Sequence, residues 1–333
     1  MINACLIGCG RMGLSHAEHI HHSPHARLYG VVDPIKENAE RVAKRYGAKI
    51  YENTEEALSD TNVNAVVIVS NTATHADLII ASAKAGKPIF CEKPIDLDLK
   101  RIDQCLKVVE ECGVPLFVAF NRRFDPSFRS LKNKISEGTI GPMEILSISS
   151  RDAPFPDIAY LKTSGGMFRD MTIHDFDIAR WLLQEEPTEV YATGSCLVDP
   201  RLKEFGDVDT AMITLKTKSG AICHINNSRR SVYGYDQRIE AFGAKGMLRV
   251  NNVTPTSVEF SFGEGVRTDN PHPSFPERYN DAYRHEINHF FEEVVLKGKE
   301  PEVSGKDGRQ ALVIAEAANS SLEKGQPVTI PVP

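Results

Sequence analysis

The sequence predicts a two-domain α/β protein: an N-terminal Rossmann domain with a doubly wound parallel sheet, followed by an α+β domain whose largely antiparallel sheet is open on one face. Short apolar runs alternate with helical patterns up to about residue 120, and a G-x-G-x-x-G string follows the first run. Consecutive strand patterns joined by turns then fill residues 190–262. Because 333 residues exceed what one hydrophobic core usually serves, we expect two domains, residues 1–121 and 122–333.

The first domain should consist of β-α-β units. We expect strands at residues 4–7, 28–32, 65–69, 89–91 and 116–119, and helices at residues 11–21, 35–45, 75–85 and 99–112. Gly47, Gly86 and Gly113 stand just past three of these helix ends, where glycine commonly terminates a helix. Right-handed crossovers between such units give a doubly wound sheet.

The second domain should begin with a helix at residues 126–135 and a strand at 144–150, followed by an irregular segment. A helix containing Asp170 and His174 comes next, and then strands at residues 190–197, 210–217, 221–227, 238–242, 247–250 and 258–262. The turn at Gly220 joins two of these strands as a hairpin, and tight turns of this kind favour an antiparallel sheet. The tail returns to helix at residues 282–296 and 308–322.

The composition favours a protein that acts on small molecules. Its 39 basic and 45 acidic side chains give a net charge of −6, so neither nucleic acid nor an anionic membrane is an expected partner. No signal peptide or membrane span is visible in the sequence. The seven cysteines are odd in number and never form a C-x-x-C pair, which favours reduced thiols, a cytoplasmic location and no metal site.

The glycine-rich string Gly8-Cys9-Gly10-Arg11-Met12-Gly13 predicts a dinucleotide-binding turn between the first strand and the first helix. Gly8 permits the tight turn, Gly10 lets the backbone approach a pyrophosphate, and Gly13 allows close packing of the helix on the strand. The first helical residues, Arg11 and Met12, present unpaired amides to the anion.

Asp33 ends the second strand, twenty residues after Gly13. A carboxylate there accepts hydrogen bonds from the adenosine ribose hydroxyls and repels a 2′-phosphate, so NAD is the expected cofactor rather than NADP. Two alternatives remain open at this point: Asp33 could simply cap the following helix beside Pro34, and Arg11 could serve a phosphate.

Polar residues also follow the third predicted strand at the edge of the sheet where open α/β folds bind ligands. Ser70, Asn71, Thr72 and His75 are therefore candidate contacts of the nicotinamide half of the cofactor. The alternative is a polar loop that only caps the next helix, through Thr74.

Glu92 and Lys93 occupy the same edge after the next strand. The following Pro94 restricts the turn and removes a donor, so the Lys93 ammonium can project into the crevice beside Glu92, although a solvated surface lysine is equally compatible with this position.

Asp170 and His174 are spaced i, i+4, so on one helix they share a face. A carboxylate beside an imidazole orients the ring and stabilises its cation, which suits a general base that removes a hydroxyl proton. The alternative is a surface ion pair or a carboxylate at a helix N-terminus, and a metal pair is disfavoured because no third ligand is evident.

The chain resembles the glucose-fructose oxidoreductase, inositol dehydrogenase and rhizopine-catabolism (Gfo/Idh/MocA) family over nearly its whole length. The resemblance rests on the N-terminal fingerprint, Glu92-Lys93-Pro94, Gly165-Gly166 with Asp170 and His174, Tyr233-Gly234-Tyr235-Asp236-Gln237-Arg238, and Asp307-Gly308. It implies a catalytic triad in which His174 takes the hydroxyl proton, Lys93 hydrogen-bonds the reacting oxygen and Asp170 orients the site. It also implies dimers or tetramers.

Within the family the chain is most similar to the inositol dehydrogenases. This implies NAD-dependent oxidation of a secondary hydroxyl of a cyclic polyol, with myo-inositol giving 2-keto-myo-inositol. The implied substrate contacts are Asn121, Arg122, Arg151, Asp152 and Tyr235. A scyllo-inositol, aldose or deoxysugar dehydrogenase is an alternative, whereas a non-catalytic nicotinamide sensor would not need Lys93, Asp170 and His174.

Overall fold

The computed structural model describes residues 1–331 of the chain, which divides into two compact units. The first comprises residues 1–124 and 281–312, and the second comprises residues 125–280 and the chain from Val313 onward. The predicted division has one boundary near residue 121, whereas here the segment 281–312 packs with the N-terminal unit. Among the helices of residues 1–331, none is long and apolar enough to cross a membrane.

The first unit is built on a six-stranded parallel sheet with the order β3-β2-β1-β4-β5-β6. Its strands are β1 (Ile2–Ile7), β2 (Ala26–Val32), β3 (Lys49–Ile50), β4 (Ala65–Ile68), β5 (Ile89–Glu92) and β6 (Leu116–Ala119). Strands β4 and β6 are buried along their whole length, because helices cover both faces of the sheet. The order reverses between β1 and β4, which is where such sheets bind ligands.

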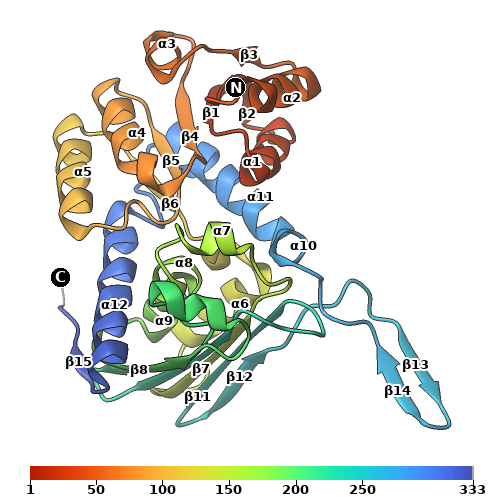
Figure 1. The fold of residues 1–333 in the computed structure, drawn as a ribbon. Helices are drawn as coiled ribbons and strands as arrows, with labels where there is room; N and C mark the ends of the chain where they lie inside the picture. Colours follow the sequence, from red (N-terminus) through yellow and green to blue (C-terminus); the bar gives the residue numbers. More distant parts are fainter. Residues whose placement is uncertain (332–333) are drawn as a thin grey trace. The chain divides into compact units, whose positions relative to one another are not determined.

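Helices of the first unit flank this sheet, with α1 and α2 on one side and α4 and α5 on the other (Figure 1). They are α1 (Arg11–His21), α2 (Lys36–Tyr46), α3 (Thr54–Ser59), α4 (Thr72–Lys84) and α5 (Leu99–Cys112). A 3₁₀ segment (Asn121–Phe124), α11 (Asn280–His289), a π-helical segment (Phe290–Leu296) and the start of α12 (Gly305–Lys324) complete the unit. The short elements β3 and α3 escaped prediction, and the helix expected at residues 282–296 changes to π-helical geometry after His289.

The second unit contains a seven-stranded sheet with the order β12-β11-β7-β10-β9-β8-β15. Its strands are β7 (Met143–Arg151), β8 (Pro187–Ser195), β9 (Thr210–Thr217), β10 (Ile222–Ser228), β11 (Asp236–Gly243), β12 (Gly246–Val250) and β15 (Val328–Thr329). All neighbouring pairs are antiparallel except β7 and β10. The predicted α/β fold with a largely antiparallel second sheet is therefore confirmed.

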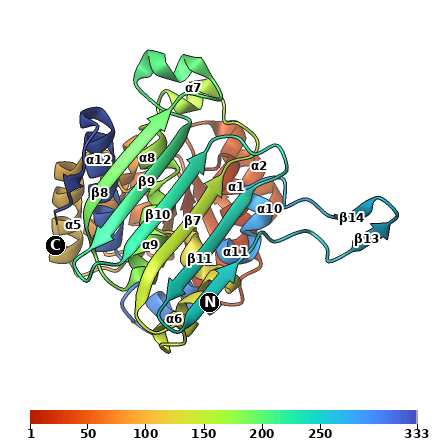
Figure 2. The same ribbon diagram turned by 90° about the horizontal axis from the view of Figure 1, so that it is seen from below.

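One face of this sheet is covered by helices and the other is open (Figure 2). The helical segments of the unit are α6 (Pro126–Ser136), α7 (Ile158–Leu161), α8 (Met167–Asp170), α9 (Ile173–Leu183), a 3₁₀ segment (Pro200–Phe205) and α10 (Phe275–Arg278). Strand β9 shows the alternation: Ala211, Ile213 and Leu215 are buried, while Met212 and Thr214 are exposed. Such alternation follows from a pleated strand with one solvated face.

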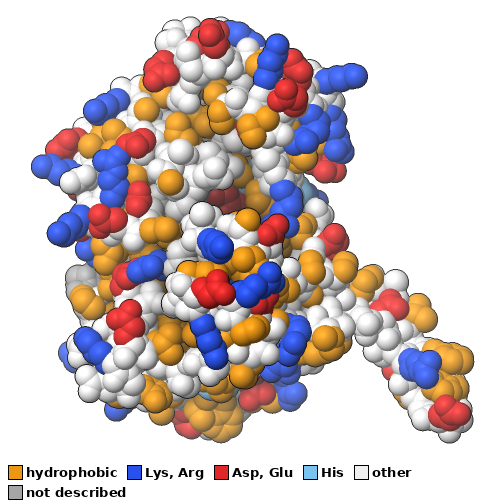
Figure 3. Space-filling view, viewed as in Figure 1, with side chains coloured by type: hydrophobic (Ala, Val, Ile, Leu, Met, Phe, Trp, Pro, Cys, Tyr) orange, Lys and Arg blue, Asp and Glu red, His pale blue; other side chains and the backbone are white. Residues whose placement is uncertain are grey.

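A separate two-stranded hairpin, β13 (Glu259–Phe262) and β14 (Gly265–Thr268), extends from the second unit. Its apolar side chains stand on the surface (Figure 3), and Val258, Phe260 and Val266 are among the most exposed large apolar residues. The rings of Phe260 and Phe262 stack on each other with centroids 5.0 Å apart.

Candidate active site

The glycine-rich turn lies between β1 and α1 and fits a pyrophosphate. Gly8 has φ of +99°, and a Cβ there would lie 2.6 Å from the Val69 carbonyl oxygen. A Cβ on Gly13 would lie 2.2 Å from the Gly8 carbonyl oxygen, so helix and turn pack at a distance that only glycine allows. A Cβ on Gly10 would meet nothing within 4 Å, so the backbone at this position faces open space that a dinucleotide could enter.

Asp33 follows β2 and holds the turn in place. One carboxylate oxygen accepts a 2.6 Å hydrogen bond from the N–H of Cys9, and the other accepts one of 2.8 Å from the N–H of Ile35. Arg41 donates to the Cys9 carbonyl oxygen at 3.1 Å, a contact that sequence reasoning missed. Burial, and then the Asp33 charge, raises the pKa of the Cys9 thiol to about 12, so this cysteine stays protonated beside the turn.

The loops that follow β4 and β5 are connected through His75. Its ring is buried, with Nδ1 2.8 Å from the Pro94 carbonyl oxygen and Nε2 3.0 Å from the Ser70 carbonyl oxygen. The Thr74 hydroxyl donates to the Asn71 carbonyl oxygen at 2.8 Å at the start of α4. The two loops predicted to reach the cofactor thus lie side by side in the first unit.

Glu92 anchors the segment that carries Lys93. One carboxylate oxygen lies 2.8 Å from Nε2 of His16 on α1, and the other accepts the Lys93 N–H at 3.3 Å. Burial opposes ionisation of Glu92, but the His16 hydrogen bond and nearby positive charges outweigh it and keep its pKa below the usual value. His16 lies on the face of α1 that packs inward and is completely buried, and no sequence motif identifies it.

Glu286 on α11 places a second carboxyl group in the same interior. It is completely buried, and neither carboxyl oxygen has a hydrogen-bond partner among the described residues. Burial, reinforced by the charge of Glu92, raises its pKa well above the ordinary value. We call His16, Glu92 and Glu286 the inner acid cluster; in it the pKa of Glu92 is lowered and the pKa of Glu286 is raised.

In the second unit Asp170 ends α8 and His174 lies in the first turn of α9. The continuous helix expected across both residues is wrong, because Met171 and Thr172 form a turn between the two helices. In this turn the Thr172 N–H donates to the Met167 carbonyl oxygen, one residue further back than in an α-helix, and the Thr172 hydroxyl donates to the Asn227 side chain on β10 at 2.6 Å. The i, i+4 spacing alone therefore did not establish the geometry of this pair.

Asp170 is held by two side chains that sequence reasoning did not identify. The Tyr160 hydroxyl donates to Asp170 Oδ1 at 2.6 Å, and Nη1 and Nη2 of Arg229 each lie 3.3 Å from Oδ2. Partial desolvation of the half-exposed Tyr160 ring and the neighbouring Asp170 charge raise the pKa of Tyr160, so the phenol remains a donor. Asp152 joins the same group, with Oδ2 3.9 Å from Nη1 of Arg229.

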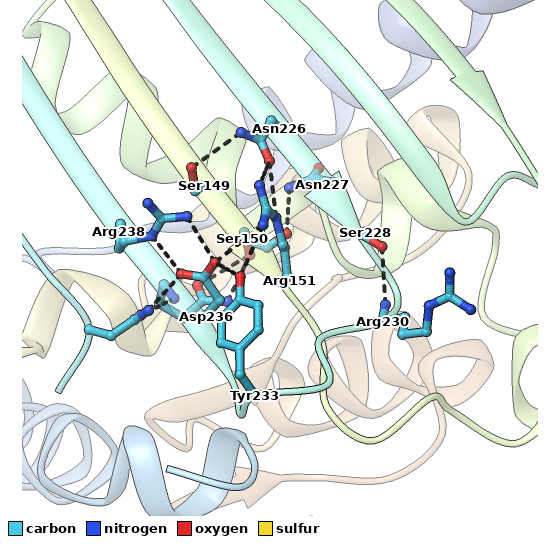
Figure 4. A network of polar contacts seen from close by, with 12 residues as sticks. Ser149, Ser150, Arg151, Asn226, Asn227, Ser228, Arg230, Tyr233, Asp236 and Arg238 are labelled. Atoms are coloured by element: carbon cyan, nitrogen blue, oxygen red, sulfur yellow. Dashed lines mark hydrogen bonds and ion pairs between the residues drawn. The ribbon is translucent and has the colours of Figure 1, made fainter. Parts of the chain in front are cut away.

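The side chain of Arg151, the last residue of β7, lies on the open face of the sheet. Its guanidinium donates to Asn226 at 3.1 and 3.3 Å and to the Tyr233 hydroxyl at 3.0 Å, and lies 3.7 Å from Asp236 (Figure 4). Asp236 in turn accepts from Tyr233 at 2.5 Å and from Arg238 at 2.7 Å. The structure thus places Arg151 in a polar network on the open face, apart from its sequence neighbour Asp152.

The remaining predicted substrate contacts are buried. Asn121 and Arg122 lie in the 3₁₀ segment directly after β6. Tyr235 packs edge-to-face on Tyr279 with ring centroids 6.0 Å apart, and its N–H donates to the His272 carbonyl oxygen at 2.8 Å. No group of three or more His, Cys, Asp or Glu side chains among residues 1–331 could hold a metal ion.

The sheet order, the glycine turn and the acid after β2 define a dinucleotide-binding domain. Residues 2–120 match the family model described as an oxidoreductase family with an NAD-binding Rossmann fold, and residues 128–249 match the GFO/IDH/MocA C-terminal domain. The chain belongs to the GFO/IDH/MocA oxidoreductase family, and the resemblance and the cofactor predicted from its motifs are confirmed.

Known relatives match the chain over nearly its whole length. It is 45% identical to a myo-inositol 2-dehydrogenase of Thermotoga maritima, over 98% of this chain and 97% of the relative. It is 46% identical to an inositol 2-dehydrogenase of Rhizobium meliloti, over 98% of each. The myo-inositol dehydrogenase of Lactobacillus casei, solved with NAD(H) and myo-inositol, is 27% identical with a TM-score of 0.90, covering 100% of this chain and 98% of that one.

Proposed function

We propose that this protein is an inositol 2-dehydrogenase that oxidises a secondary ring hydroxyl of myo-inositol to give 2-keto-myo-inositol, with NAD as oxidant. The observation that carries the proposal is identity of 45% and 46% to two inositol 2-dehydrogenases over 98% of the chain. Retention of Lys93, Asp170 and His174, which a non-catalytic sensor would not require, supports it.

The proposed chemistry separates a hydride from a proton. NAD held by the first unit would supply the oxidant for the hydride that leaves the hydroxyl-bearing carbon. His174 takes the hydroxyl proton as general base, Lys93 donates a hydrogen bond to the reacting oxygen, and Asp170 orients the substrate. The anchoring of Lys93 through Glu92 and of Asp170 through Tyr160 and Arg229 supports these roles, because a catalytic group acts only when its position is held.

The cofactor would lie along the first unit. Backbone amides at Arg11 and Met12 would face the pyrophosphate across the glycine turn, and Asp33, whose oxygens retain lone pairs beyond its two backbone bonds, would accept from the ribose hydroxyls. The other proposed cofactor contacts are Gly8, Gly10, Gly13, Ser70, Asn71, Thr72, His75, Glu92 and Lys93.

Substrate contacts are proposed for Asn121, Arg122, Asp152 and Tyr235. Asp152 has the strongest support, because it faces the same guanidinium as Asp170. The three partners of Arg151 on the open face favour a structural role for that side chain.

We also propose that the protein is a cytoplasmic homo-oligomer, a dimer or tetramer. The open face of the second sheet carries a row of aligned apolar residues: Phe242 lies opposite both Met247 and Ile145, and Ile145 lies opposite Ile222. These four side chains are 42–46% exposed, which favours burial against another copy. All seven cysteines are unpaired, as expected in a reducing compartment.

Initial rates of NADH formation test the proposed activity, with NAD and NADP each offered against myo-inositol, scyllo-inositol and glucose. We expect turnover of myo-inositol with NAD. The variants Lys93→Ala and His174→Ala should lower kcat by about 10²- to 10⁴-fold with unchanged NAD affinity, whereas the exposed-site control Lys100→Ala should leave both unchanged. Binding of NAD without turnover of any polyol would refute the proposal, and turnover of an aldose alone would reassign the substrate.

A further inference from the structure

Arg229 is the first residue after β10 and lies in the interior of the second unit. Its N–H donates to the Asp209 carbonyl oxygen at 2.8 Å, and its side chain is only 1% exposed. Burying a charged arginine side chain costs free energy unless acidic groups pair with it, so its position inside the unit requires such partners. No sequence motif pointed to it.

Two carboxylates pair with this guanidinium, and the charge of a third acts on it. Asp170 comes from α8, Asp152 follows β7, and Asp207 precedes β9. Burial alone would lower the pKa of Arg229, but these three charges outweigh it and raise the pKa above its ordinary value. Asp207 also accepts the N–H of Met167, the first residue of α8, at 2.8 Å. We call Arg229 with Asp152, Asp170 and Asp207 the arginine hub.

In the arginine hub the Asp170 carboxylate is surrounded by hydrogen-bond donors. Arg229 donates toward Oδ2 and Tyr160 donates to Oδ1, so both oxygens face donors while 11% of the side chain remains exposed. Donors on both oxygens stabilise the carboxylate form, which only accepts hydrogen bonds. Such a group suits contact with a polyol hydroxyl better than proton transfer.

We propose that Arg229 is a positioning residue for the dehydrogenase reaction, which together with Tyr160 holds the Asp170 carboxylate in the orientation that accepts a hydrogen bond from a ring hydroxyl of the substrate. The inference rests on the proposed function, because it needs a substrate rich in hydroxyl groups. Arg229 acts through Asp170 and does not itself touch the reacting atoms.

A double-mutant cycle tests this coupling. We expect Arg229→Gln to lower kcat/KM for myo-inositol by about 10- to 100-fold, the range for a lost hydrogen bond to a charged group, with NAD affinity unchanged within about twofold. Arg229→Lys keeps the charge and should recover part of the loss. The matched control is Arg230→Gln, at the adjacent exposed position. In an Asp170→Asn background, Arg229→Gln should have almost no further effect on kcat/KM.

If the losses in kcat/KM caused by Arg229→Gln and by Asp170→Asn multiply in the double variant, the inference is overturned. Independent effects would mean that Arg229 supports the fold generally and does not act through Asp170. If Arg229→Gln fails to fold, the same cycle is run with Tyr160→Phe, which removes one hydroxyl from a half-exposed ring. Tyr160→Phe should lower kcat/KM by about threefold or more, and only in the presence of Asp170. A wild-type protein without polyol turnover refutes the proposed function instead.

Discussion

The buried carboxyl of Glu286 should make the stability of this protein depend on pH, and Glu286→Gln should remove that dependence. Glutamine has nearly the same shape but cannot ionise. Burial and the charge of Glu92 raise the pKa of Glu286 in the folded chain well above the value of 4.5 that it has when exposed to solvent. Between those two pKa values the folded protein therefore keeps a proton that the unfolded chain loses.

The sign of the effect follows from proton linkage. Below about pH 4.5 Glu286 is protonated in both states, and its ionisation costs the fold nothing. Above that pH the unfolded chain releases the proton, so the free energy of unfolding falls by about 1.4 kcal/mol per pH unit until the folded-state pKa is reached. The Glu286→Gln variant has no carboxyl group to ionise at this position. The free energy of unfolding of the variant should therefore rise relative to that of the wild type, by the same slope, as the pH rises.

Urea denaturation between pH 4 and pH 9 measures the effect, with the exposed-site variant Glu300→Gln as the control from the same unit. We expect the wild-type and Glu286→Gln curves to agree near pH 4 and to separate as the pH rises, while the control follows the wild type. Parallel curves for wild type and Glu286→Gln across the whole range would show that Glu286 is not protonated in the folded state.

Two further predictions concern the cofactor turn. Gly13→Ala should weaken NAD binding by more than tenfold and lower the melting temperature, because the new Cβ meets the Gly8 carbonyl oxygen at 2.2 Å. Gly10→Ala should weaken NAD binding with an unchanged melting temperature, because its Cβ fills only open space. Equal loss of stability in both variants, measured by calorimetry beside NAD fluorescence titration, would contradict this. Asp33→Asn removes the charge expected to repel a 2′-phosphate, so the ratio of kcat/KM for NADP to that for NAD should rise at least about tenfold. An unchanged ratio would mean that Asp33 only holds the backbone of the turn and does not select the cofactor.

Local patterns in the sequence were sufficient to predict most elements of this fold. Strand β6 and helices α1 and α5 have the predicted bounds, and Gly47 and Gly113 end α2 and α5 in the left-handed conformation. These features depend on residues close together in the chain, where apolar spacing and glycine conformational freedom decide the outcome. The break between α8 and α9 was not predicted, and its residue Thr172 contacts Asn227, which is 55 residues away in the chain.

The sequence by itself determined the class of protein, its nucleotide-binding turn and the candidate catalytic residues, because each of these is written in a short motif. Only the tertiary structure showed how those residues are held: Arg229 and Tyr160 on Asp170, and His16 with buried Glu286 around Glu92. Apart from Tyr160, which is 10 residues from Asp170, these partners come from segments far apart in the chain. A buried charge has meaning only through the partners that folding brings within a few ångströms of it, and such partners leave no periodic or local signal in a single sequence.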